Sequence, residues 1–257
     1  MKLYIANKNY SSWSLRPWIL MREKGIAFEE IITPFSDHGE MSPFIKFSPT
    51  GNVPCLDDGG TLVWDSLAIC EYLAENTPSC WPAERVARAW ARSAAAEMHS
   101  SFQTLRTQCQ MNCGVRVTLN NIDDALRANI ERVSALWCEG LQRFGGPYLA
   151  GKTYTIVDAF FAPVVFRVQS YGLCLAAPAQ AYAKHVLSLP SMRQWYDEAM
   201  REVWRKDAYE KSVASYGLIT ADERVIDEGR MWTFGEGHIC CEAGCLKNRP
   251  RISHDKR

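Results

Sequence analysis

The spacing of hydrophobic and polar positions changes near residue 80 of the chain. Before that point, short apolar runs alternate with turns and with helical spacing, which predicts the order strand, helix, strand, short helical piece, strand, strand, helix. The predicted strands are residues 2–6, 28–32, 54–56 and 61–64, and the predicted helices are residues 15–24 and 65–75. This first region therefore mixes strands with helices.

The pattern after residue 82 is almost entirely helical. Long stretches rich in Ala, Leu, Glu and Arg follow one another, with breaks at residues 112–114 and 145–147. Apolar residues recur at helical spacing within residues 87–102 and again within 126–141. These features predict a helical domain.

The segment 76–82, N-T-P-S-C-W-P, separates the two regions. It contains two prolines and shows no periodicity, which is typical of a linker. We therefore expect one domain in residues 1–80 and a second in residues 81–217.

One helix of the second region carries its own start signal. Thr155 and Asp158 form the pattern T-x-x-D of a capping box, in which each side chain can bond to the other's backbone amide. We expect a buried helix at residues 156–171.

Residues 218–257 differ from the rest of the chain. They show little periodicity and a basic end, so we expect an irregular tail whose removal after Gly217 leaves the fold intact. The tail contains four residues of the types that bind zinc: His238, Cys240, Cys241 and Cys245. Because their spacing is not the paired C-x-x-C arrangement of a strong zinc site, we predict no metal site.

Composition and charge exclude several classes of partner. Lysine plus arginine equals aspartate plus glutamate at 29 each, so no positive excess attracts nucleic acid or anionic lipid. The first ten residues lack the apolar core of a secretory signal, and the apolar stretch 159–168 is interrupted by Pro163 and Arg167 and is too short to span a membrane. Most of the ten cysteines are scattered singly, which is typical of a reduced protein. We expect a cytoplasmic protein.

The first candidate segment for chemistry is the serine loop N-K-N-Y-S-S-W-S-L-R-P-W at residues 7–18. Because proline is tolerated in the first turn of a helix, Pro17 predicts a helix start no earlier than about Ser14. Ser11 and Ser12 would then lie in the loop and face the positive end of the helix. A hydroxyl there can donate a hydrogen bond to a thiolate, although the segment alone is more typical of a simple serine cap.

The second segment, S-P-T-G-N-V-P-C-L, places Pro54 at the start of a predicted strand. A proline there cannot complete a sheet ladder, so we expect a cis Val53–Pro54 bond at a sheet edge. The amide and carbonyl of Val53 would then be free to pair with a peptide-like ligand. A simple loop proline is the alternative.

The third segment, T-L-V-W-D-S-L-A-I-C-E-Y-L, places Ser66 at a helix start directly after a strand. A hydroxyl, backbone amides and the helix dipole together can hold a carboxylate, and Asp65 can pair with an ammonium group. As a lone motif this segment is also an ordinary helix cap.

In this order and at these spacings, the three segments resemble those of bacterial cytosolic glutathione transferases. The resemblance spans about residues 2–215 and includes N-Y-S-S-W-S, N-V-P, D-S-L-A-I-C-E-Y-L-A-E, A-E-M-H-S-S-F and T-I-V-D-A-F-F-A-P. It implies a thioredoxin-like α/β N-terminal domain followed by an all-α helical domain. The serine loop is similar to the S-S-C-S loop of the zeta class, with Trp13 where those proteins have cysteine.

The resemblance also implies roles for individual residues. Ser11 would donate a hydrogen bond to the glutathione sulfur, with Ser12 assisting. The implied glutathione-binding residues are Asn52, Val53, Pro54, Asp65 and Ser66. The candidates for the second-substrate pocket are Tyr10, Trp13, Met98, His99, Phe102 and Arg106, each of which is also a common core or surface residue.

The implied activity is attack of a glutathione thiolate on small electrophiles, with peroxidase activity as a possible addition, in a homodimer. Glutathione would be the co-substrate, and no metal is required. The alternatives are a glutathione-dependent isomerase, which Trp13 disfavours, and a non-catalytic ligand-binding module on the same fold.

Overall fold

The computed structural model describes residues 1–36 and 42–224, and all statements below concern those residues. The described residues all belong to one compact unit. The candidate zinc ligands His238, Cys240, Cys241 and Cys245 lie outside the described residues. The boundary expected between residues 80 and 81 stays a prediction.

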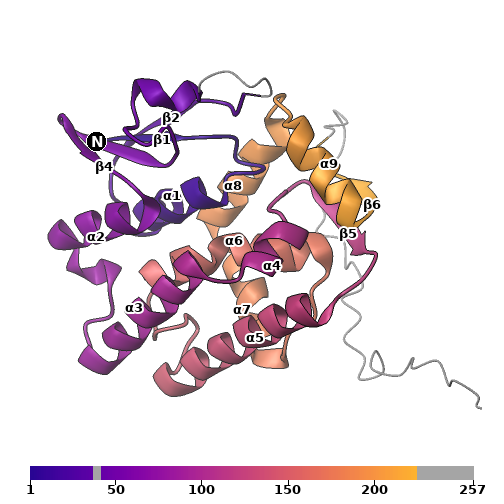
Figure 1. The fold of residues 1–257 in the computed structure, drawn as a ribbon. Helices are drawn as coiled ribbons and strands as arrows, with labels where there is room; N and C mark the ends of the chain where they lie inside the picture. The colour runs from indigo at the N-terminus through magenta and orange to yellow at the C-terminus, as the bar shows by residue number, and fades with distance from the viewer. Residues whose placement is uncertain (37–41, 225–257) are drawn as a thin grey trace, which may run out of the picture. The chain divides into compact units, whose positions relative to one another are not determined.

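A four-stranded sheet forms the N-terminal part (Figure 1). Its strands are β1 (Lys2–Ile5), β2 (Glu29–Ile32), β3 (Cys55–Asp58) and β4 (Thr61–Val63). The strand order is β2-β1-β3-β4, with β1 and β2 parallel and the other two pairs antiparallel. Leu3 lies opposite Leu56 and both are fully buried, so this face of the sheet faces the core.

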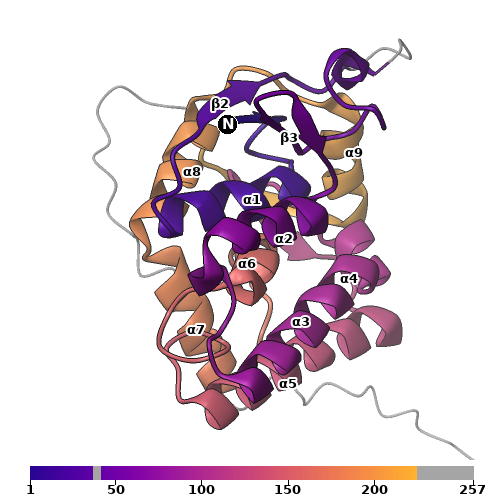
Figure 2. The same ribbon diagram turned by 90° about the vertical axis from the view of Figure 1, so that its left-hand side faces the viewer.

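Two helices, α1 (Ser12–Glu23) and α2 (Ser66–Asn76), lie against the sheet (Figure 2). Two short 3-10 helices complete this region, η1 (Pro43–Lys46) and η2 (Pro78–Cys80). The mixed strand and helix order predicted for the first 75 residues is confirmed, and its arrangement is thioredoxin-like.

The predicted start of α1 is wrong. The helix begins at Ser12 rather than Ser14, with Ser11 as its N-cap, and Pro17 lies inside it. Proline removes one helical hydrogen bond, but α1 is buried along most of its length. Burial of side chains such as Trp18 and Ile19, both fully inaccessible, stabilises the helix enough to offset that loss.

Seven helices follow in the second part of the chain. They are α3 (Arg85–Ser100), α4 (Gln103–Gln108), α5 (Asp124–Phe144), α6 (Ile156–Tyr171), α7 (Ala177–Leu187), α8 (Pro190–Arg201) and α9 (Asp207–Tyr216). The central helix is α6, which packs against α1, α3 and α7 and is buried on nearly every side. The predicted helix at residues 156–171 is therefore confirmed.

The capping box of α6 is present as predicted. Asp158 accepts hydrogen bonds from the amides of Thr155 and Leu149, each at 2.9 Å, and from the Tyr182 hydroxyl at 3.1 Å. The carboxyl is fully buried, and burial raises its pKa to about 6 against the lowering effect of these donors.

The second part also contains two strands, which the sequence did not predict. Strand β5 (Val115–Leu119) pairs antiparallel with β6 (Gly217–Asp222). The helical region is thus not purely α-helical, and the expected irregular tail begins with an ordered strand. Gly217 is required by the close pairing, because a Cβ there would lie 2.6 Å from the Thr118 carbonyl oxygen.

Arg224 fixes the end of this pair. Its guanidinium bonds to Asp222, to Glu210 of α9 and to the hydroxyl of Tyr10 in the serine loop.

Within residues 1–36 and 42–224, no helix is long and apolar enough to cross a membrane.

Candidate active site

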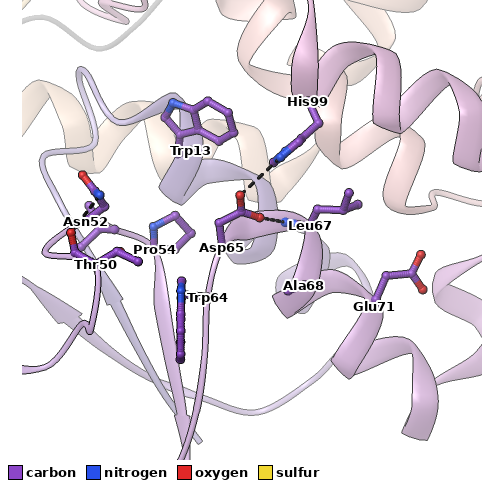
Figure 3. Close-up of a pocket in the computed structure, with 11 residues that line it drawn as sticks. Trp13, Thr50, Asn52, Pro54, Trp64, Asp65, Leu67, Ala68, Glu71 and His99 are labelled. Atoms are coloured by element: carbon purple, nitrogen blue, oxygen red, sulfur yellow. Dashed lines mark hydrogen bonds and ion pairs between the residues drawn. The ribbon is translucent and has the colours of Figure 1, made fainter.

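Two adjoining pockets lie at the N-terminus of α1, and both are lined by Trp13, Asn52 and Val53. The larger, here the α2 pocket, has a volume of about 750 Å³. It is lined by Trp13, Thr50, Asn52, Val53, Pro54, Trp64, Asp65, Leu67, Ala68, Glu71 and His99 (Figure 3). The smaller, here the serine pocket, has a volume of about 310 Å³. It is lined by Tyr10, Ser11, Ser12, Trp13, Phe35, Phe44, Asn52, Val53, Arg106, Gln110, Met111, Arg167 and Tyr209.

The serines of the loop line the smaller pocket at the start of α1. The Ser11 hydroxyl donates to Oγ of Ser14 at 2.7 Å and accepts from the Ser14 amide at 3.4 Å. The Ser12 hydroxyl and the Trp13 amide have no hydrogen-bond partner among the described residues. Free donors and the positive end of a helix therefore meet here, an arrangement that favours an anion.

Val53 and Pro54 line the wall that the α2 pocket shares with the sheet. The Val53–Pro54 bond is cis, as predicted. The expected position at a sheet edge is wrong, because β3 lies between β1 and β4 and the proline precedes the strand. The described part of the chain nevertheless offers no hydrogen-bond partner to the Val53 amide or carbonyl.

Asp65 caps α2, and its carboxylate accepts from the Leu67 amide at 2.9 Å. Its other oxygen lies 3.3 Å from Nε2 of His99, which reaches across from α3 (Figure 3). Burial lowers the pKa of His99, and this outweighs the opposing effect of Asp65, so the imidazole is mostly neutral at pH 7. His99 thus orients the carboxylate without neutralising its charge.

Ser66 lies below the pocket rather than in its wall. Its side chain is fully buried, and its hydroxyl accepts from Nη1 of Arg16 at 3.4 Å. The amide of Ala68, which does line the pocket, has no acceptor among the described residues. The anion-binding potential of this helix start therefore comes from backbone amides rather than from the serine hydroxyl.

The structure separates the six candidates for the second-substrate pocket. Tyr10, Trp13 and Arg106 line the serine pocket, whereas His99 lines the α2 pocket. Met98 and Phe102 are buried in the core and line neither pocket. Periodicity cannot separate these roles, because a core side chain and a pocket side chain follow the same helical spacing.

Tyr10 is held by the end of the described chain. Its hydroxyl donates to Glu210 and accepts from Arg224 at 3.2 Å. Burial raises its pKa well above the ordinary value, so it stays neutral at physiological pH.

Sequence reasoning missed several residues of the serine pocket: Phe35, Phe44, Gln110, Met111, Arg167 and Tyr209. Only Arg167 carried a signal, since it is the one charged residue in an otherwise apolar stretch of α6 after the capping box.

Comparison with known proteins agrees with this geometry. Residues 10–76 match the model of the glutathione S-transferase N-terminal domain. A zeta-class glutathione S-transferase of Euphorbia esula is 29% identical over 168 residues, which cover 64% of this chain and 75% of the relative. A probable maleylacetoacetate isomerase of Caenorhabditis elegans is 26% identical over 182 residues, covering 68% and 81%.

A solved structure shares the fold as well. It is a glutathione transferase homologue from Burkholderia with bound glutathione, with a TM-score of 0.57 and 24% identity, covering 77% of this chain and 96% of that one. The matched residues include positions 10–18 of the serine loop, Val53 with Pro54, and the start of α2. Residues 10–76 thus match the N-terminal domain of glutathione S-transferases, and the chain is similar in sequence and fold to members of that family.

Proposed function

We propose that the protein is a glutathione S-transferase that ionises the glutathione thiol at the start of α1 and directs it at a small electrophile. One observation carries the proposal. A pocket suited to an extended peptide and a second, smaller pocket share a wall at Trp13, Asn52 and Val53, and Ser11 and Ser12 line the second pocket next to that wall. A nucleophile held in the first can therefore reach a substrate held in the second.

Glutathione fits the α2 pocket by the chemistry of its groups. The free amide and carbonyl of Val53 would pair with the backbone of the cysteinyl residue, in the manner of an added strand. The carboxylates of Asp65 and Glu71 would attract the γ-glutamyl ammonium, and the start of α2 its carboxylate. Asn52 lies where either pocket can use its amide.

The mechanism needs a thiolate at neutral pH. A free thiol has a pKa of about 8.5, and each unit of lowering corresponds to about 1.4 kcal/mol. A serine hydroxyl and the helix terminus would supply roughly one to two units. The Ser11 hydroxyl would turn from Ser14 toward the sulfur, and the unpartnered Ser12 hydroxyl would assist.

Three reactions distinguish the proposed activity from its alternatives. Purified protein would be assayed with glutathione and a chlorodinitrobenzene, an organic hydroperoxide, or a cis-enone. We expect conjugation of the first, with peroxide reduction as a weaker activity. Isomerisation alone would favour the isomerase alternative, and glutathione binding without turnover of any of the three would favour a ligand-binding module.

We also propose a cytoplasmic homodimer acting in detoxification, by analogy with the family. A species of monomer mass in light scattering at micromolar concentration would contradict the dimer.

A further inference from the structure

The serine pocket contains two positive side chains and no negative one among the described residues that line it. Arg106 and Arg167 both face this cavity of about 310 Å³. Glu210, which contacts Tyr10 at the pocket wall, is already paired with Arg224. The charge of the two guanidinium groups is therefore not balanced within the pocket.

Backbone carbonyls fix the orientation of both arginines. Nε of Arg106 donates to the Ser101 carbonyl and Nη2 to that of His99, at 2.9 and 3.1 Å. Nε of Arg167 donates to the Cys109 carbonyl at 2.8 Å and Nη1 to that of Pro163 at 3.2 Å.

These bonds leave one terminal nitrogen of each arginine unused. Nη1 of Arg106 and Nη2 of Arg167 have no partner among the described residues. Arginine carries its charge throughout the physiological pH range, and a guanidinium with an unused donor binds carboxylates well.

The surroundings of Arg106 and Arg167 further favour the binding of an anion. Arg167 is only 4% exposed, and burial together with the charge of Arg106 lowers its pKa to about 10. The fully buried Arg16 adds a third charge nearby, and its guanidinium carbon lies 4.1 Å from the ring centre of Trp13. The guanidinium carbon of Arg106 lies 4.9 Å from the same centre. The Trp13 ring thus makes cation–π contacts with two guanidinium groups at the boundary of the two pockets.

The remaining walls are aromatic. Phe35, Phe44 and Tyr209 line the pocket, and Phe35 packs edge-on against both of the others at 5.6 and 5.7 Å between ring centres. A flat, unsaturated ring can stack against such walls. The space is at the lower end of the range for small-molecule sites.

We propose that the second substrate is a small aromatic or unsaturated carboxylate whose acid group binds between Arg106 and Arg167. This rests on the proposed transferase function and specifies the substrate class of its second pocket. It narrows the small electrophile of the proposed function to one that carries a carboxylate.

A matched pair of probes tests the proposal. They are 4-chloro-3,5-dinitrobenzoate and 4-chloro-3,5-dinitrobenzamide, which share size and ring and differ in charge. In both, the glutathione thiolate attacks the carbon bearing chlorine, a carbon–sulfur bond forms, and chloride leaves with the electrons of the carbon–chlorine bond. Dividing each kcat/KM by the uncatalysed rate constant removes the difference in intrinsic reactivity.

We expect this corrected kcat/KM to be at least about tenfold higher for the acid, because a charge-assisted hydrogen bond contributes a factor of roughly 10 to 100. Arg106→Met and Arg167→Met should each reduce that preference, whereas Arg106→Lys should retain part of it. Arg143→Gln, at an exposed arginine of α5 outside both pockets, is the control and should leave the preference unchanged.

Binding measurements with unreactive ligands test the carboxylate site separately from the proposed transferase activity. Calorimetry with 3,5-dinitrobenzoate and 3,5-dinitrobenzamide needs no turnover. If acid and amide bind equally and react equally, the carboxylate proposal is overturned while the transferase function stands. If the acid binds more tightly but neither chloro compound is turned over, the transferase function fails and the anion site remains.

Discussion

At the scale of single residues, the serine loop carries the sharpest question about mechanism. The Ser11 hydroxyl is occupied by Ser14, whereas the Ser12 hydroxyl is unpartnered, and both serines line the pocket. The resemblance to the family favours Ser11 as the hydrogen-bond donor to sulfur. The hydrogen bonds in the structure favour Ser12 instead, because its hydroxyl is available to donate without breaking an existing bond.

We predict that Ser11→Ala lowers kcat by roughly 10- to 1000-fold, as expected when an anion loses a hydrogen-bond donor. Glutathione affinity should stay within a few-fold, because the tripeptide is held mainly at Val53 and at the start of α2. The ultraviolet absorbance of the bound thiolate, titrated against pH, should report a raised thiol pKa.

Parallel titrations of Ser12→Ala and Ser14→Ala serve as controls for that assignment. A normal Ser11→Ala enzyme alongside an inactive Ser12→Ala enzyme would move the role to Ser12. If none of the three substitutions mattered, activation by serine would have to be abandoned.

At the scale of elements, the start of α6 links helix capping to pH. The pKa of the Asp158 carboxyl is about 6 in the folded protein, above its ordinary value of 3.8. The native state therefore binds more protons than the unfolded state between these two values. Over that range the contribution of Asp158 to stability falls as pH rises.

Asp158→Asn removes this titration together with two good acceptor positions. We predict a less stable protein at every pH, with a penalty about 2 kcal/mol larger at pH 4 than at pH 7. Urea unfolding at both pH values measures it, and Glu131→Gln at an exposed site on α5 is the control. A penalty that grew with pH would contradict the assigned direction.

A second prediction at this scale concerns the charged cluster around Arg224, which fixes the end of the β5–β6 pair. Arg224 is 5% exposed and its partners Glu210 and Asp222 are 24% and 40% exposed, so the cluster is only partly shielded from solvent. We predict that Arg224→Met lowers the free energy of unfolding by about 1–3 kcal/mol, below the cost of breaking a fully buried pair.

Arg132→Met is the matched control, because the ion pair of Arg132 with Glu97 is exposed and should contribute under about 1 kcal/mol. Equal effects of the two substitutions in urea unfolding would show that the Arg224 cluster has no special role.

At the scale of the whole molecule, truncation tests where the fold ends. Removal of everything after Gly217 deletes most of β6 and Arg224 and leaves Glu210 and Tyr10 without that cation. We now predict loss of soluble protein or a lower thermal midpoint, contrary to the expectation from sequence. Truncation after Arg224, which keeps β6 and the Arg224 cluster, should fold normally, as measured by circular dichroism.

The sequence predicted the elements that have local signals. The cap at Thr155, the proline after Val53 and the aspartate before α2 each act on neighbouring residues, so they could be read from a short window. The start of α1 was placed wrongly, because tertiary burial outweighed the local preference of Pro17. Strand β6 and the pocket residue Arg167 could not be assigned, since both depend on partners far away in the chain.

The separation of β5 from β6 has a consequence for synthesis on the ribosome. Leu119 pairs with Gly217, so β5 emerges 98 residues before the residue that completes its ladder. At about 5–20 residues per second, the nascent chain waits roughly 5–20 s with this strand unpaired. Val115 and Val117 are then exposed on an open edge, which is a template for pairing with other chains. A chaperone that covers this segment should therefore act late in translation, and its loss should reduce the yield of soluble protein more than the equilibrium stability would suggest.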